Sequence, residues 1–279
     1  MKSFLLLILM GLALNSSGQK NNAQIILTKG QKFSVHTTIS QEADMGMGMG
    51  MKNNTSSQNK FYIIDADDKN YTASNTLTGL KVSIDFMGQQ TNYDSDLKED
   101  SASEIGKSIQ NLNIPDTISI DKYTGSVISL KKTVPAAKEE GSNPMEMLFE
   151  SLGDKNDDMA LSQAFFMIPA GKKTGDSWMD SSSTKEQKSI KTYTIKSIDK
   201  NLATITVTGK VESNIQTEAQ GLQVNVNMTT KTNSEIIADT KTSLVSKYST
   251  KADISGNMEL MGQSAPITGK ATTVSVYEY

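Results

Sequence analysis

The sequence predicts a β-dominated α+β protein whose strands form one or two curved antiparallel sheets, in the manner of a half-barrel. Three observations predict this class. Long runs alternate apolar and polar residues in both halves of the chain, helix-spaced apolar residues lie between them, and short motifs recur in the same order. We therefore expect a helical segment between two related β halves.

The first 18 residues have the pattern of a secretory signal peptide. A positive start at Met1–Lys2 is followed by an apolar run, Phe4–Leu14, and by small residues up to Gly18. The alternative is a membrane anchor, which needs roughly 20 apolar residues, more than this run has. We expect residues 1–18 to be removed near Gly18. The mature chain should then be periplasmic or extracellular, with no transmembrane span.

The first β segment is expected at 19–94. Phe33, Val35, Thr37 and Ile39 alternate with Ser34, His36 and Thr38, which is the period of a strand with one apolar face. Gly79 and Gly88 mark chain reversals. The other strands of this segment are expected at 60–64, 71–78 and 80–87.

A helical connector is expected at 95–170. Apolar residues recur at helix spacing from Asp96 to Leu112, ahead of the helix-breaking Pro115. A second helix should start at Asn143–Pro144, because proline is favoured in the first helical turn. One strand is expected within the connector, near 117–131.

The second β segment is expected at 171–279. Leu222, Val224 and Val226 alternate with polar residues, as in an antiparallel sheet with one wet face. Residues 271–279 are rich in β-branched side chains and form a plausible closing strand.

Short motifs of the first β segment return in the second. Gly30–Phe33 matches Gly175–Trp178, and the order of the matches is preserved, which indicates an internal duplication. The alternative is that β proteins reuse the same turn chemistry by chance. The other matched pairs are Tyr62–Asn70 with Ile195–Asn201 and Ile120–Val127 with Ile237–Leu244.

Composition excludes several classes of site. The chain has no cysteine, so disulfides, thiolate metal sites, cysteine nucleophiles and a lipid anchor at the cleavage site are excluded. The formal net charge is −3, and acidic and basic residues are interspersed without a basic stripe. Nucleic acid is therefore not an expected partner.

A methionine–glycine run is the candidate metal site. Met45, Met47, Met49 and Met51 alternate with glycine, so an extended chain would send all four sulfur atoms to one face. Thioether sulfur selects Cu(I). The alternative is a hairpin tip or a glycine-weakened strand whose methionines pack on apolar surface.

Two further motifs have ordinary structural interpretations. Asp65, Asp67 and Asp68 suggest a calcium loop, but Lys69 stands where a third ligand belongs, and a hairpin turn explains the run better. His36 is the sole histidine and lies on the polar side of its strand, with no G-x-S-x-G motif in the chain. A surface histidine is expected.

Acidic residues of the connector could pair as an acid and a base, although a solvated helix face is their default role. No catalytic residue and no cofactor is predicted from the sequence. These acidic residues are Glu139, Glu140, Glu146 and Glu150.

Two short motifs carry a family resemblance. Ile168–Pro169 followed by Lys172–Trp178, together with the turn Asp121–Val127, resembles an uncharacterised exported bacterial β-rich family, a domain of unknown function. The resemblance implies no catalytic residues. The long strands with helices on one side are also similar to the half-barrels of periplasmic lipoprotein carriers, which is a likeness of architecture and does not fix function.

We therefore expect a non-enzymatic exported envelope protein that binds an apolar ligand such as a lipid, or an envelope protein, in a groove between sheet and helices. The alternative is a hydrolase or a methionine-based metal-binding protein. The natural lining of the groove, which is equally natural core, is Phe149, Leu152, Leu161, Phe165 and Phe166.

Overall fold

The computed structural model describes residues 24–44, 46, 50–109, 111–133, 161, 163–219, 222–260 and 263–279. Strands dominate these residues, and many are long. The strands are β1 Lys32–Asp44, β2 Gly50–Ala66, β3 Asn70–Phe86, β4 Gln89–Asp94, β5 Asp116–Asp121, β6 Val127–Lys131, β7 Ser177–Ser183, β8 Gln187–Asp199, β9 Leu202–Ala219, β10 Leu222–Asp239, β11 Val245–Leu260 and β12 Gln263–Glu278.

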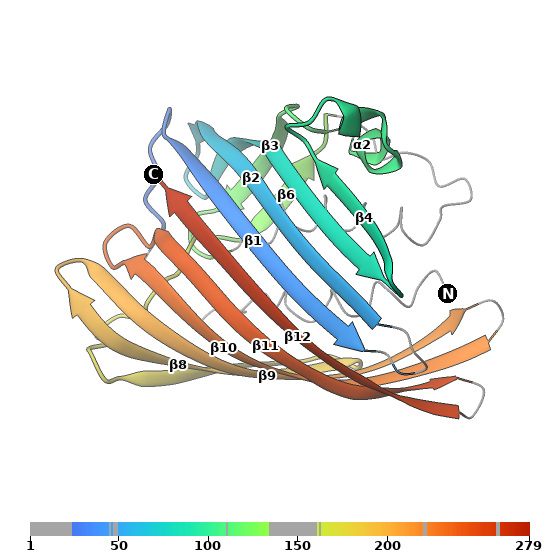
Figure 1. The fold of residues 1–279 in the computed structure, drawn as a ribbon. Coiled ribbons are helices and arrows are strands. Elements are labelled where there is room, and N and C mark those ends of the chain that lie inside the picture. The colour runs from blue at the N-terminus through green and yellow to red at the C-terminus, as the bar shows by residue number, and fades with distance from the viewer. Residues whose placement is uncertain are drawn as a thin grey trace.

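All 12 strands belong to one antiparallel sheet, in the order β6-β5-β3-β2-β1-β12-β11-β10-β9-β8-β7, with β4 beside β3. Most neighbours in the sheet are also neighbours in sequence. There are two exceptions. Strand β3 pairs with β5 as well as with β4, and β1 pairs with β12, which joins the two halves along the line from Ser34–Glu278 to Asp44–Thr268. Figure 1 shows β1–β4 as one wall and β8–β10 as another, with β11 and β12 between them. The expected curved antiparallel sheet is confirmed.

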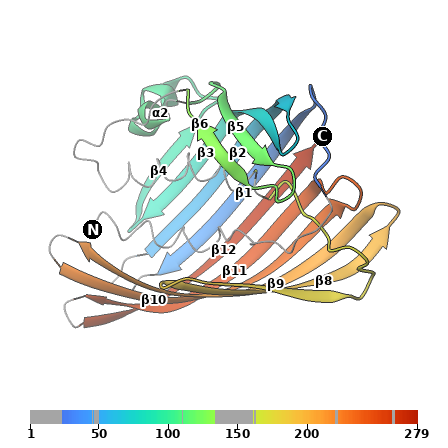
Figure 2. The same cartoon turned by 180° about the vertical axis from the view of Figure 1, so that it is seen from behind.

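Buried and exposed residues alternate along most of the strands, so the sheet has one covered face and one wet face. We call these the inner and outer faces. Ile63 and Ile118 of the first half belong to the same core cluster as Ile195 and Ile205 of the second, although the two walls diverge in Figure 2. We call this cluster the apolar end. It also contains Ile25, Leu27, Phe33, Val35, Phe61, Tyr71, Ala73, Ile120, Leu161, Ala164, Phe165, Tyr193, Ala203, Val207, Ile236, Ala238, Val245 and Tyr277.

Glycines on the inner face allow the sheet to bend. A Cβ atom added at Gly256 would lie 2.1 Å from the carbonyl oxygen of Asn227 on the next strand. One added at Gly269 would lie 2.8 Å from the carbonyl oxygen of Glu42. Neighbouring strands can approach this closely only where no side chain projects between them. The bend therefore depends on glycine at these positions.

The two halves begin with the same backbone geometry. Gly30 has φ 86° and Gly175 has φ 91°, in the left-handed region that favours glycine. Each donates its N–H at 2.8 Å to the carbonyl of an isoleucine, Ile63 or Ile195. The isoleucine N–H returns a hydrogen bond to the residue after the glycine, at 2.9 Å and 3.0 Å respectively. A shift in strand register follows each isoleucine.

The two halves also share one turn. Asp121 Oδ1 accepts hydrogen bonds from the N–H groups two and three residues later, at 2.9 and 2.8 Å, and Asp239 Oδ1 does the same at 2.8 Å each. Each turn then contains a residue of positive φ, Gly125 at 72° or Ser243 at 61°. The starting glycines, the register shifts and the turns therefore correspond between the two halves, which is compatible with the duplication that the sequence suggests.

Charged residues of alternating sign cross the outer face over six neighbouring strands. Lys52 and Glu42, which lie opposite each other, form an ion pair with 3.8 Å between Nζ and Oε1. Opposite charges on directly paired strands stabilise a sheet and disfavour slipped registers. We call this row the charge ladder. Its members, in order, are Asp85, Lys52, Glu42, Lys270, Asp253 and Lys231.

The connector differs in detail from its expected form. The helix expected from Asp96 to Leu112 is a 3₁₀ turn, η2 at Glu99–Ala102, and a short helix, α2 at Glu104–Ser108. The strand expected near 117–131 is the antiparallel pair β5 and β6, which continues the sheet of the first half. The helix expected at Asn143–Pro144 lies outside the described residues. Among the described residues, no helix is long and apolar enough to cross a membrane.

Candidate functional site

A band of small and polar side chains lies on the inner face, in the middle of the sheet. Cross-strand register places them in three adjoining rows, beside the apolar end. Several are almost fully buried, among them Asn53, Thr273 and Ser275 at 1%, 1% and 0% exposure. We call these residues the central band. Its members are Thr37, Gln41, Asn53, Thr55, Ser57, Thr232, Ser234, Thr250, Ala252, Ala271, Thr273 and Ser275.

Most polar groups of the central band with a described partner bond to one another. The hydroxyls of Thr37 and Ser275 are 3.0 Å apart. Ser234 Oγ donates to Thr250 Oγ1 at 2.8 Å. Thr273 Oγ1 is buried and has no hydrogen-bond partner within the part of the chain that the structure describes. Burying a hydroxyl without a partner costs about 1–3 kcal/mol, so a face that only had to pack would be expected to be apolar.

Lys191 and Asp180 lie at one end of the central band. They face each other across β8 and β7, on the inner side of the sheet, and both are half-buried. Burial lowers the pKa of Lys191, and the nearby Asp180 opposes this by raising it. On its other side Lys191 is paired with Gly209 of β9, and Gly209 is paired with Thr232, a member of the central band.

An aromatic stack adjoins this charged pair. Trp178 and Tyr193 lie parallel, with ring centroids 5.2 Å apart, and Phe166 packs against Tyr193 at 5.6 Å. Burial raises the pKa of Tyr193 well above its usual range, and the Asp180 charge adds to the effect. Tyr193 belongs to the apolar end, and Phe166 and Trp178 pack against that cluster.

Of the four candidate metal ligands, only Met51 lies among the described residues. Met51 lies on the inner face of β2 and is 2% exposed. Met45, Met47 and Met49 lie outside the described residues, so copper binding stays a prediction. No group of three or more histidine or acidic residues suited to a metal occurs in the part of the chain the structure covers.

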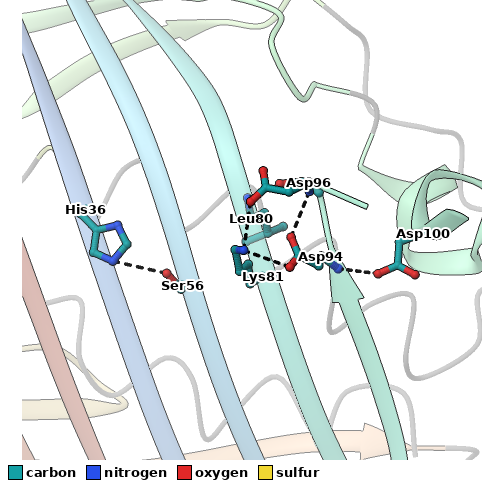
Figure 3. A network of polar contacts seen from close by, with 8 residues as sticks. His36, Ser56, Leu80, Lys81, Asp94, Asp96 and Asp100 are labelled. Carbon is teal, nitrogen blue, oxygen red and sulfur yellow. Dashed lines mark hydrogen bonds and ion pairs between the residues drawn. The ribbon is translucent and has the colours of Figure 1, made fainter. Parts of the chain in front are cut away.

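His36 lies on the outer face and is exposed. Its Nε2 atom is 3.4 Å from the hydroxyl of Ser56, and Figure 3 shows it directed at Ser56 on the next strand, with no dashed contact to the carboxylates around Lys81. Lys81 contacts Asp94 and Asp96 at 2.9 Å each, at exposed positions. These are surface ion pairs that solvent reaches, so they do not indicate a binding or catalytic site.

The acidic run near Asp67 is a turn. Asp67 Oδ1 accepts hydrogen bonds from the N–H groups of Lys69 and Asn70 at 2.7 Å each. These hydrogen bonds lower the pKa of Asp67 against a smaller effect of burial that raises it. The carboxylate therefore shapes the hairpin between β2 and β3, as the sequence indicates.

The aromatic and aliphatic residues expected to line a groove are mainly core. Leu161 and Phe165 are buried in the apolar end at 1% and 7% exposure, and Phe166 packs against it. Phe149 and Leu152 lie outside the described residues, as do the four glutamates of the connector. The central band was not identified from sequence, although hydroxyl and amide residues at alternate positions, as in Thr55 and Ser57, were a usable signal.

Two open grooves lie beyond the central band, on the side away from the apolar end. One, of about 670 Å³, is lined by residues of the charge ladder with Ala43, Met51 and Ile254. Another, of about 490 Å³, follows the β7–β8 turn to β11 and has mainly polar lining. Neither contains aromatic side chains or a concentration of one charge, so the central band is the stronger candidate.

Among solved structures, the chain is similar in fold to lipovitellin, in a structure described as lipid–protein interactions in lipovitellin. The TM-score is 0.54 at 8% identity, over 91% of this chain and 26% of that one. The chain thus spans about a quarter of lipovitellin. An outer membrane channel from Pseudomonas putida F1 matches 94% of this chain and 100% of its own at 7% identity, but with a TM-score of 0.27.

No curated protein sequence matches the chain. A family model does, over residues 68–245, which is more than half of the chain and includes β8, β9, β10 and most strands of the first half. The matched region contains both Asp turns and Lys191. The chain belongs to the family of unknown function DUF6263.

Proposed function

We propose that this protein is a non-enzymatic, exported binding protein that takes an amphiphilic, lipid-like ligand on the inner face of its sheet. The observation that carries the proposal is the central band, a run of small polar side chains next to a fully apolar cluster. A ligand with one polar and one apolar part would satisfy both regions.

The physical reason lies in what each region can offer a ligand. Hydroxyls and amides of the band donate and accept hydrogen bonds, and the apolar surface gains about 25 cal/mol for each Å² it hides from water. Binding sites for small molecules generally combine apolar walls with a few placed polar groups. The fold likeness to lipovitellin is compatible with this proposal and adds no more than a shared architecture.

The proposal is tested by removing one hydroxyl without changing shape. Thr273→Val takes away the buried Oγ1, whereas Thr272→Val changes its exposed neighbour on the outer face and serves as the control. We expect Thr273→Val to weaken binding of a fluorescent fatty-acid probe about three- to tenfold, the value of one hydrogen bond. Thr272→Val should leave it unchanged.

Native mass spectrometry of protein purified from its own host complements this measurement. A co-purified amphiphile, released by organic solvent, is the expected result. If the wild type binds no amphiphile in either assay, the proposal is wrong. If Thr273→Val binds as the wild type does but is more stable, the band serves packing alone.

A further inference from the structure

Lys191 is distinguished by its position. At the strand positions that the structure describes, it is the only lysine on the inner face, and the chain's other described strand lysines project from the outer face or from a bulge. A lysine side chain is rarely covered unless a counter-charge or a ligand accompanies it. Its position therefore needs a reason.

The Lys191 side chain lies beside Gly209, where the neighbouring strand has no side chain. A Cβ atom added at Gly209, its neighbour on β9, would be 3.8 Å from Lys191 Cγ and 2.4 Å from Thr232 Oγ1. The Lys191 stem therefore lies in van der Waals range of this position, which Gly209 leaves without a side chain. The Trp178–Tyr193 stack flanks the same stretch of β7 and β8.

Comparison with the first half shows that the fold does not require this charge. Register aligns Trp178 and Tyr193 with the stacked pair Phe33 and Phe61, whose ring centroids are 4.7 Å apart. One pair further along, the first half has Val35 opposite Asn59, where the second has Asp180 opposite Lys191.

The third member of this row also differs. Asn59 is paired with Leu77 of β3, while Lys191 is paired with Gly209 of β9. The first half thus has apolar and amide side chains at a place where the second half has a lysine, an aspartate and a glycine. An uncharged set occupies the corresponding place of the first half, so the shared backbone does not by itself require a lysine there.

We propose that Lys191 binds the anionic headgroup of the ligand, which makes the ligand an acidic amphiphile such as a long-chain carboxylate or phosphate ester. This inference rests on the proposed function. An ammonium group forms charge-assisted hydrogen bonds with carboxylate and phosphate oxygens, about twice as strong as neutral ones. The headgroup would lie at the Lys191 end of the central band.

Two observations support the assignment. Lys191 is half-buried, so a headgroup can reach it from solvent while its stem stays covered. Burial also lowers the pKa of Lys191, and this effect is larger than that of Asp180, which raises it. A bound anion would raise the pKa as Asp180 does and would favour the charged form of the lysine.

The test compares two probes that differ only in the headgroup. Hexadecanoate and hexadecanol are titrated against the full mature chain, by displacement of a fluorescent probe. We expect the wild type to prefer hexadecanoate by about tenfold or more, the value of one charge-assisted hydrogen bond. Lys191→Gln should lose this preference and retain its affinity for hexadecanol.

Two controls keep the result interpretable. Lys191→Arg keeps the charge and should keep the preference. Lys188→Gln removes an exposed lysine from the outer face of the same strand and should change nothing. Circular dichroism on each variant verifies that the sheet is intact.

The outcomes separate this inference from the proposed function. Equal affinity of the wild type for both probes, or a preference that survives in Lys191→Gln, overturns the role of Lys191 but leaves amphiphile binding in place. Failure of the wild type to bind either probe overturns both.

Discussion

In the first half of the sheet Phe33 stacks on Phe61, and in the second half Trp178 stacks on Tyr193 at the equivalent place. Backbone turns and bulges correspond as closely as these stacks do. Beyond the stack, however, the second half has Lys191 where the first has Asn59. The comparison teaches that the two halves keep the same backbone hydrogen bonds and one aromatic pair, while other inner-face positions differ in charge and size.

The bend of the sheet offers the strongest way to test this comparison. Gly256→Ala in the second half places a methyl group against a backbone oxygen, whereas Gly79→Ala in the first half meets only the Gln58 side chain at 3.6 Å. We expect Gly256→Ala to lower the free energy of unfolding by about 3 kcal/mol, as overpacking does. Gly79→Ala should change it by about 1 kcal/mol or less. Urea denaturation measures both, and equal effects would show that the bend does not depend on Gly256.

The shared turn gives an effect of intermediate size. Asp121→Ala and Asp239→Ala each remove a carboxylate that accepts two backbone N–H groups. We expect each to lower the free energy of unfolding by about 1–2 kcal/mol, with the two values alike because the turns are alike. Exposed Asp68→Ala is the control and should have little effect. A large cost for one turn only would argue against equivalent roles.

Acid should weaken the Asp239 turn. Burial raises the pKa of Asp239, but the N–H groups of Thr242 and Lys241 outweigh it and hold the pKa below the ordinary 3.8. A carboxyl whose pKa is lower in the folded state stabilises the fold above its unfolded pKa and loses this contribution as pH falls below it. Asp239→Ala should therefore lose less stability than the wild type between pH 5 and about pH 2. Parallel acid-unfolding curves would contradict this.

The charge ladder gives the smallest effect and tests the seam between the halves. Glu42→Lys puts three lysines side by side across β2, β1 and β12, with Lys52 and Lys270 as neighbours. Because these side chains are largely exposed, we expect a loss of about 0.5–1 kcal/mol at low salt and less at high salt. Adding Lys270→Gln removes one of the three adjacent like charges without placing a carboxylate opposite Asp253, and it should restore part of the loss. No recovery in the double variant would mean that the effect at the seam is not electrostatic.

Period-2 alternation predicted the long strands, because one covered face forces an apolar residue at every second position, as at Phe33 and Val35. The repeats at Gly30 and Gly175 were also readable, since positive φ leaves glycine as the favoured residue. The pairing of β1 with β12 could not be predicted, because no local sequence pattern connects Ser34 to Glu278.

The central band escaped prediction for a physical reason. Thr37 was counted with the apolar positions of its strand, and its hydroxyl acquires meaning only when Ser275 is brought within 3.0 Å. Lys191 lies on the inner face because it alternates in step with the buried Ser189, Tyr193 and Ile195 of its own strand, but its neighbours Asp180 and Gly209 are set by strand pairing. Long-range register decides which side chains meet at such positions, and a single sequence does not encode it visibly.

The contact between the first and last strands has a consequence for how the chain acquires its shape. Ser34 and Glu278 are separated by 244 positions, so β1 cannot find β12 until almost all of the intervening polypeptide exists. Contacts of such long separation form slowly because closing the loop costs entropy before any bond rewards it. Until then the first half carries a bare edge of 13 residues, open to pairing with other chains. Pairing of β1 with β12 is therefore the step that covers this edge and removes it as a site of association with other chains.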